Sequence, residues 1–218
     1  DVYGIVDRIC FAGYGLVFYL QKLIVPYPLS ALHPFPKELT VYYYAATAIA
    51  VAGIAFLILK VRNRNVLFGF GFYIINLVLV LQLISIGNAV VAERYTYVPY
   101  IGLLFMLAME VALAIKNKLS SYKTLLLSLA GIWIIFLAFL TWTRIPVWNN
   151  SQALWENVLR QYPESPRAWT NKGLDLFDQK KWPEVIADLS NALKADQNYA
   201  DALEWRCRAY LETKEPDK

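Results

Sequence analysis

The stretch at residues 88–102 reads Asn-Ala-Val-Val-Ala-Glu-Arg-Tyr-Thr-Tyr-Val-Pro-Tyr-Ile-Gly and joins two apolar runs, 66–86 and 97–115. A connection between two membrane helices needs only a few small or polar residues. This one contains an adjacent acid and base, three tyrosines and a proline. Tyrosine gathers where a membrane helix meets water. We therefore expect this stretch to lie at a membrane boundary and to contain the functional site.

The composition is that of a membrane protein. The chain has 218 residues, of which 58% are hydrophobic and 17% charged, and its mean hydropathy is +0.38. The hydrophobic fraction is higher, and the charged fraction lower, than in typical soluble domains. Most acidic residues follow residue 150, whereas residues 1–145 are apolar blocks with short polar joints. We predict an all-α fold, with a polytopic membrane domain of four or five helices at 1–145 and a soluble segment at 146–218.

Four apolar runs are long enough to cross a bilayer, which takes about 20 residues; they are 41–59, 66–86, 97–115 and 125–143. A shorter run at 10–25 is either a tilted helix that starts near residue 2 or an interfacial segment. Residues 26–40 contain four prolines and the only histidine, His33. Proline at that density excludes a continuous helix and predicts an ordered loop outside the membrane.

Basic residues assign the orientation of these helices. They gather in the joints at 60–65 and 116–123, which fall on the same side of the membrane when the spans are counted along the chain. The positive-inside rule makes that side cytoplasmic. Residues 26–40, 87–96 and 144–218 are then periplasmic or lumenal. Because the basic residues mark membrane joints and form no patch, we expect no nucleic-acid partner.

The soluble segment has an internal period. Ala168-Trp169 recurs as Ala202-Leu203, a spacing of 34 residues. This is the period of the tetratricopeptide repeat (TPR), a pair of helices. We predict a partial unit at 151–165, a repeat at 166–199 and an incomplete repeat at 200–218. The sequence also begins with Asp1 and stops inside a repeat, so we expect a longer natural chain.

Local signals place the ends of these helices. Asn150 or Ser151 is the expected N-cap of the first helix. Ser165 followed by Pro166 predicts a capped helix start with proline at the first helical position, and Pro183 opens the next helix. Gly173 is expected where the paired helix crosses.

Residues 92–102 and the 34-residue period together resemble one family. They are similar to the transmembrane-and-tetratricopeptide O-mannosyltransferase-like proteins, which have a GT-C type membrane fold. The family motif usually reads Ala-Asp-Arg-Tyr-Thr-Tyr-x-Pro, and Glu93 replaces its aspartate here. The proline-rich loop around His33 and the passage from Trp148 to Trp155 also resemble the family.

The resemblance implies a function. Such proteins transfer a sugar from a polyprenyl-phosphate carrier to a protein hydroxyl on the non-cytoplasmic face of the membrane. Their proposed catalytic aspartate lies in an N-terminal loop that has no counterpart here, so we identify no catalytic residue. The resemblance therefore implies that this chain is the C-terminal part of a glycosyltransferase, and we expect it to be inactive by itself. A polyprenyl-phosphate-linked sugar would be its donor, and the need for a divalent metal stays open.

Five residues are candidates for binding the carrier phosphate or the substrate. Arg94 either binds the phosphate through its guanidinium or extends to the interface and pairs with Glu93 or a lipid headgroup. Glu93 is a base, a metal ligand or an ion-pair partner. Tyr95 and Tyr97 line a sugar or isoprenoid path, or belong to an aromatic belt together with Tyr100. His33 binds substrate or is a hydrogen-bonding loop residue. A zinc site is not expected, because one histidine without a ligand cluster cannot form it.

The repeats suggest a protein partner. We expect their concave face to present a mixed surface for an acceptor or partner protein: Arg167, Thr170, Leu174 and Asp178. The alternative is a spacer packed on the membrane domain. Two functions follow. The first is part of a lipid-carrier-dependent protein O-glycosyltransferase embedded among membrane lipids. The second is a non-catalytic membrane-anchored TPR scaffold in a larger complex. The spans carry too few buried charges for a channel.

Overall fold

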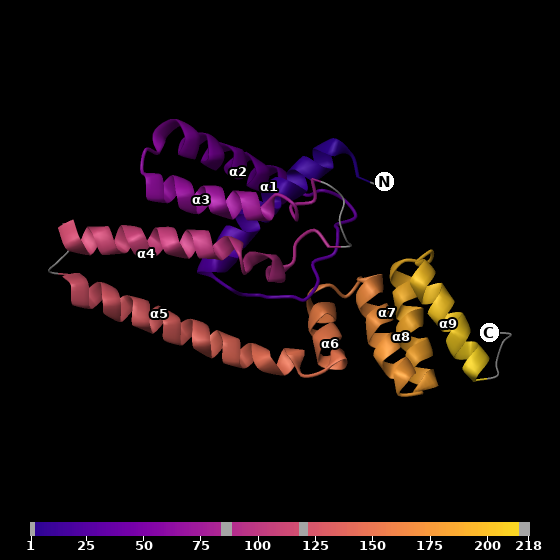
Figure 1. Cartoon of the computed structure of the whole chain (residues 1–218). Helices are drawn as coiled ribbons and strands as arrows, with labels where there is room; N and C mark the ends of the chain where they lie inside the picture. Colours follow the sequence, from indigo (N-terminus) through magenta and orange to yellow (C-terminus); the bar gives the residue numbers. More distant parts are fainter. Residues whose placement is uncertain (1–2, 84–88, 118–121, 214–218) are drawn as a thin grey trace. The chain divides into compact units, whose positions relative to one another are not determined.

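The computed structural model describes residues 3–83, 89–117 and 122–213. This part of the chain confirms the all-α prediction, since the chain is 77% helical and the described residues form no strand. The chain divides into two compact units (Figure 1). The first comprises Asp1–Leu29 and His33–Leu140, and the second comprises Ser30–Leu32 and Thr141–Lys218.

Within the described residues, the first unit is built from five long helices, shown from indigo to salmon in Figure 1. They are α1 (Ile5–Ile24), α2 (Val41–Lys60), α3 (Arg64–Leu77), α4 (Pro99–Asn117) and α5 (Lys123–Arg144), of which the last four residues of α5 belong to the second unit. The predicted runs 41–59, 97–115 and 125–143 are confirmed as α2, α4 and α5. The run at 10–25 is part of α1, which starts earlier, at Ile5.

Three helices are long and apolar enough to cross a membrane. They are Val41–Lys60, Pro99–Lys116 and Lys123–Trp148, within the residues that the structure describes. Only 6% of the α2 window and none of the α5 window is buried inside the chain. Side chains such as Ile58 and Phe139 are more than 60% exposed. A contiguous apolar surface of this extent is suited to lipid contact.

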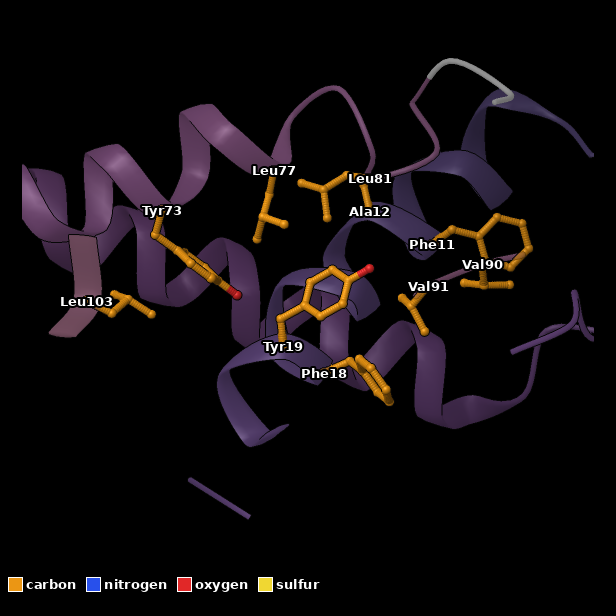
Figure 2. Packing of buried hydrophobic residues seen from close by; sticks show 10 residues of the cluster. All are labelled: Phe11, Ala12, Phe18, Tyr19, Tyr73, Leu77, Leu81, Val90, Val91 and Leu103. Atoms are coloured by element: carbon orange, nitrogen blue, oxygen red, sulfur yellow. The ribbon is translucent and has the colours of Figure 1, made fainter. Parts of the chain in front are cut away.

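α1 is the central helix of the first unit. Its side chains Phe11, Phe18 and Tyr19 are at most 6% exposed and form the core with residues of α3, α4 and the segments that connect them (Figure 2). The other members of this cluster are Ala12, Tyr73, Leu77, Leu81, Val90, Val91 and Leu103. The hydroxyl of Tyr73 in α3 donates to the carbonyl of Leu16, which ties α3 to α1 at 2.7 Å.

Glycines allow two close helix crossings. A Cβ atom added to Gly69 of α3 would lie 2.5 Å from Cβ of Met106 in α4, and one added to Gly102 of α4 would lie 2.8 Å from Cβ of Phe72. On α1, a Cβ at Gly13 would lie 2.6 Å from Cα of Thr47 in α2. Small residues let membrane helices approach until their backbones touch. These crossings therefore fix the pairs α3–α4 and α1–α2.

The prediction of one span over 66–86 is wrong. α3 ends at Leu77 and is 14 residues long, or about 21 Å at 1.5 Å per residue. The chain then turns back, since Gln82 has a φ of 61° and its side-chain amide donates to the carbonyl of Ala89. Leu77 and Leu81 are buried. These two side chains are apolar because they pack in the protein core, whereas the prediction placed them in contact with lipid. Residues 84–86 of the predicted span lie outside the described residues.

The second unit is a row of short helices: η3 (Ile145–Trp148), α6 (Ser151–Gln161), α7 (Pro166–Asp178), α8 (Trp182–Ala195) and α9 (Ala200–Glu212). Asn150 caps α6 by accepting from the amide of Ala153 at 2.8 Å. Ser165 caps α7, and Pro183 lies in the first turn of α8. These predicted helix starts are confirmed.

α7 and α8 form a helical hairpin. A Cβ atom on Gly173 of α7 would lie 3.4 Å from Cγ of Leu189 in α8, which agrees with the predicted crossing. Val185, Leu189 and Ala192 of α8 are fully buried between the neighbouring helices, and so is Ala202 of α9. The start residues of α7 and α9, Pro166 and Ala200, are separated by the 34-residue period.

Candidate functional site

The candidate site lies where the proline-rich loop meets the Glu93-Arg94 segment. After Ile24 the chain has no helix until Val41, as predicted for 26–40. One residue of this loop, His33, forms an isolated antiparallel bridge with Val91, and its carbonyl accepts from the amide of Val90 at 3.0 Å. The backbone therefore holds the loop against the residues that immediately precede Glu93.

A side-chain contact joins the same two segments. Nε2 of His33 lies 2.8 Å from Oε1 of Glu93. The side chains of His33 and Glu93 are 8% and 23% exposed. The ring of Phe18 in α1 packs edge-on against the imidazole, with 5.0 Å between the two ring centres. The structure thus brings together two of the predicted site residues, which are 60 positions apart in the sequence.

Tyr19 of α1 anchors both ends of the segment. Its hydroxyl accepts from the amide of Ala92 at 3.0 Å, and its carbonyl accepts from the hydroxyl of Tyr100 at 2.6 Å. Its side chain is fully buried at the centre of Figure 2. Tyr100, one of the expected belt residues, is therefore bound to α1. The segment from Ala92 to Tyr100 is held at fixed points on α1.

Lys22 contributes a nearly buried cation next to the loop. Its Nζ donates to the carbonyl of Pro28 at 2.6 Å and lies 5.3 Å from the centre of the Phe18 ring. The residue is 8% exposed. Burial lowers the pKa of Lys22, and the negative charge of Glu93 partly opposes this. α1 is not among the three candidate spans, and Lys22 is near its loop end.

Glu93 and Arg94 diverge. They open η1 (Glu93–Thr96), a single 3₁₀ turn in which the hydroxyl of Thr96 donates to the carbonyl of Glu93 at 2.6 Å. Arg94 is exposed, and its guanidinium lies 5.1 Å from the centre of the Tyr95 ring. Adjacent residues in a helical turn point in different directions. Glu93 thus faces the protein, whereas Arg94 is available to a ligand.

The remaining predicted residues lie outside this cluster or on the second unit. Tyr97 is 78% exposed. On α7, Arg167 and Leu174 are partly exposed and Asp178 is exposed. Thr170 is 4% exposed, and its hydroxyl donates to the carbonyl of Pro166 at 2.8 Å. Its side chain is therefore not on an exposed face, because it closes the first turn of its own helix.

Sequence reasoning missed Phe18, Tyr19 and Lys22 as parts of this site. A lysine near the end of an otherwise apolar run was the one available signal, because a cation there needs an interfacial position or a partner. Nothing in the sequence around Tyr19 distinguishes it from the other tyrosines. In the described ranges, no three His, Cys, Asp or Glu side chains are grouped so that they could hold a metal ion.

Comparison with models of protein families, with curated proteins and with solved structures finds no match to this chain.

Proposed function

We propose that this chain is part of a polyprenyl-phosphate-sugar-dependent protein O-glycosyltransferase, in which Arg94 binds the phosphate of the lipid carrier. One observation carries the proposal. Glu93 turns toward His33, whereas the neighbouring guanidinium is exposed beside an aromatic ring at the start of a candidate membrane span. A guanidinium is always charged and can donate two parallel hydrogen bonds to two oxygens of one phosphate.

The surroundings of Arg94 support a binding role. The segment is attached to α1 through Tyr19 and to the proline-rich loop through His33, so Arg94 emerges from a fixed turn. A fixed cation loses less conformational freedom on binding than one on a free loop. Tyr95 and Tyr97 would flank the bound carrier.

The contacts of the first unit also support the proposed orientation. His33 and Glu93 put the proline-rich loop and the motif at one end of the helices. At the other end, Asn63 and Asn65 donate to Oε1 of Glu110 at 2.8 and 3.2 Å, which brings the 60–65 joint to α4, the helix that leads to the 116–123 joint. The positive-inside rule would make the end with both joints cytoplasmic and the motif periplasmic or lumenal.

The second unit would bind the acceptor or a partner protein. We interpret α7 and α8 as one TPR and α9 as the start of another, because the hairpin, the glycine crossing and the period of 34 residues occur together. Arg167, Leu174 and Asp178 remain the proposed contacts. Thr170 is withdrawn because it is buried.

A second candidate is a membrane-anchored TPR scaffold without catalytic activity. The observation in its favour is that Glu93 and Tyr100 are both used in contacts that hold the fold together. In this case the motif would preserve the shape of the anchor, and the repeats would dock a larger complex.

The test is sugar transfer from a polyprenyl-phosphate donor by the protein as cells produce it, in native membranes, since the resemblance gives residues 1–218 no catalytic residue of their own. We expect Arg94→Ala to lower transfer by about 10²-fold, the scale of removing one preorganised hydrogen-bond donor to negative charge in a transition state. Arg94→Lys should retain part of it, and Lys116→Ala, which removes an exposed cation at the other end of α4, should have no effect. Equal transfer by wild type and Arg94→Ala would exclude the role of Arg94. No transfer by the wild type, together with partner binding, would favour the scaffold.

A further inference from the structure

An apolar groove lies on the first unit between α1, α2 and α3. Its volume is about 400 Å³, and none of its lining residues is charged. Its lining includes Leu20 of α1, Ile54 of α2 and Phe70 of α3. The one hydroxyl among the lining residues, that of Tyr73, already donates to the carbonyl of Leu16. The groove therefore suits an occupant without polar groups.

The helix pairing explains why the groove is open. α2 packs against α1 at Gly13 and Thr47, whereas α3 packs against α4 at Gly69 and Gly102. α2 and α3 therefore pack against different helices, α1 and α4, and this leaves the space between α2 and α3 open. A Cβ atom added to Gly53, in the α2 lining, would meet nothing within 4 Å.

The length of the groove fits one leaflet of a bilayer. Its lining along α2 runs from Ile49 to Val61, the residue that follows the helix, which is about 18 Å at the helical rise per residue. The hydrocarbon core of a bilayer is about 30 Å thick, so each leaflet contributes about 15 Å. One acyl chain of a phospholipid spans that depth.

Cations stand at one end of the groove. Val61 lines it and lies between Lys60 and Arg62, and Arg64 follows at the start of α3. All three basic residues are exposed, and among the described residues none of them forms an ion pair within 4 Å. The nearby carboxylate of Glu110 accepts from Asn63 and Asn65. The joint therefore keeps a net positive charge where an acyl chain would meet its headgroup.

We propose that this groove binds one anionic glycerophospholipid, with an acyl chain along Gly53 and the phosphate at Lys60, Arg62 and Arg64. The inference rests on insertion of α2 into a membrane, and it is independent of the role proposed for Arg94. Charge complementarity and the reach of a single leaflet select a phospholipid over the longer polyprenyl carrier.

Native mass spectrometry of the full chain in detergent tests this proposal. The probes are phosphatidylglycerol and phosphatidylcholine with identical acyl chains, and undecaprenyl phosphate. The wild type should retain one phosphatidylglycerol in preference to phosphatidylcholine by at least about tenfold, since each basic residue near a lipid surface contributes about fivefold to binding of anionic lipid. Replacing Lys60, Arg62 and Arg64 together by Ala should remove the preference, whereas Lys116→Ala should keep it.

A matched glycine pair tests the position of the acyl chain. Gly53→Leu fills the groove and should abolish retention of phosphatidylglycerol. Gly71→Leu is the control, because a Cβ at Gly71 also meets nothing within 4 Å but this residue does not line the groove. Equal retention by the two variants would overturn the proposal. So would equal binding of both phospholipids by the wild type, or stronger retention of undecaprenyl phosphate that Gly53→Leu removes. If Gly53→Leu does not fold, the triple Ala variant of Lys60, Arg62 and Arg64 still tests the proposal, because these residues are exposed.

Discussion

At the residue scale, the neighbours Glu93 and Arg94 make different contacts. Glu93 reaches across 60 residues of sequence to His33, and Arg94 lies outside against Tyr95. The sequence supports the choice of both residues as site candidates. It gives no sign of the His33 contact, because a pairing across that separation depends on how α1 and the loop fold back. The same reason hides Tyr19, whose partners are Ala92 and Tyr100.

The first prediction uses this pair of neighbours. Glu93→Ala removes the carboxylate that contacts the nearly buried His33, so the free energy of unfolding should fall by about 1–3 kcal/mol. Arg94→Ala is the control, and a change at an exposed position should stay within about 0.5 kcal/mol. Denaturant titration of the full chain in detergent measures both. An equal effect of the two substitutions would show that the Glu93–His33 contact does not stabilise the fold.

At the element scale, sequence reasoning was successful where the signal is local. Asn150, Ser165 and Pro183 mark helix starts because capping involves only the next three residues. It was unsuccessful for the run at 66–86. Hydropathy measures how apolar a segment is, and Leu77 and Leu81 are apolar because they pack in the core. Only the tertiary fold distinguishes that environment from lipid.

The second prediction concerns the crossing of α3 and α4. Gly69→Ala puts a Cβ 2.5 Å from Cβ of Met106, so the helices must separate and the free energy of unfolding should fall by about 1–3 kcal/mol. Gly71→Ala is the matched control on the same helix, where the added methyl meets nothing. It should be neutral or raise the stability by up to about 1 kcal/mol, because alanine favours helix over glycine. Thermal unfolding in detergent compares the two variants. A Gly71→Ala variant that is less stable than Gly69→Ala would contradict this packing.

The third prediction is a pH dependence in the second unit. Asp188 of α8 is 7% exposed, its Oδ1 lies 3.6 Å from Nζ of Lys172, and its Oδ2 has no hydrogen-bond partner among the described residues. Burial raises the pKa of Asp188, Lys172 opposes this, and Glu156 and Glu184 reinforce it. The folded state then binds a proton more tightly than the unfolded state. The contribution to stability is therefore present at low pH and is lost as the pH rises from the ordinary aspartate value through the raised one.

Asp188→Asn tests that sign, because asparagine does not titrate. The stability of the variant relative to the wild type should increase as the pH rises through this window and then stay constant. Urea titrations followed by tryptophan fluorescence at several pH values measure the difference. Asp178→Asn, at an exposed position of α7, is the control. A variant that loses stability relative to the wild type as the pH rises would refute the sign.

At the scale of the whole molecule, the described residues contain three candidate membrane spans, and a group of side-chain contacts lies at each end of the first unit. His33 and Glu93 mark one end, and Glu110 with the two asparagines marks the other. The charge pattern of the sequence predicts this separation into two sides. It cannot predict that the loop and the motif touch, because the positive-inside rule assigns sides and gives no contacts.

The fourth prediction is the sidedness of these ends. In a chain with Cys207→Ser, a thiol introduced as Tyr97→Cys should react with a membrane-impermeant maleimide added outside sealed cells. A thiol introduced as Arg62→Cys should react only after the membrane is permeabilised. The native Cys10 is buried and should react slowly at most. The reverse labelling pattern would show that the motif is cytoplasmic.

The most direct test of the proposed function is a comparison of two lipids that differ only in their headgroup. The full chain in detergent is titrated with polyprenyl phosphate and with the corresponding polyprenol, and bound lipid is measured by native mass spectrometry. We predict that the wild type prefers the phosphate by at least about tenfold, the scale of one charge-assisted hydrogen bond, and that Arg94→Ala binds both lipids equally. A wild type that does not distinguish the two lipids, or an Arg94→Ala variant that still prefers the phosphate, would contradict the assignment of Arg94 to the carrier phosphate.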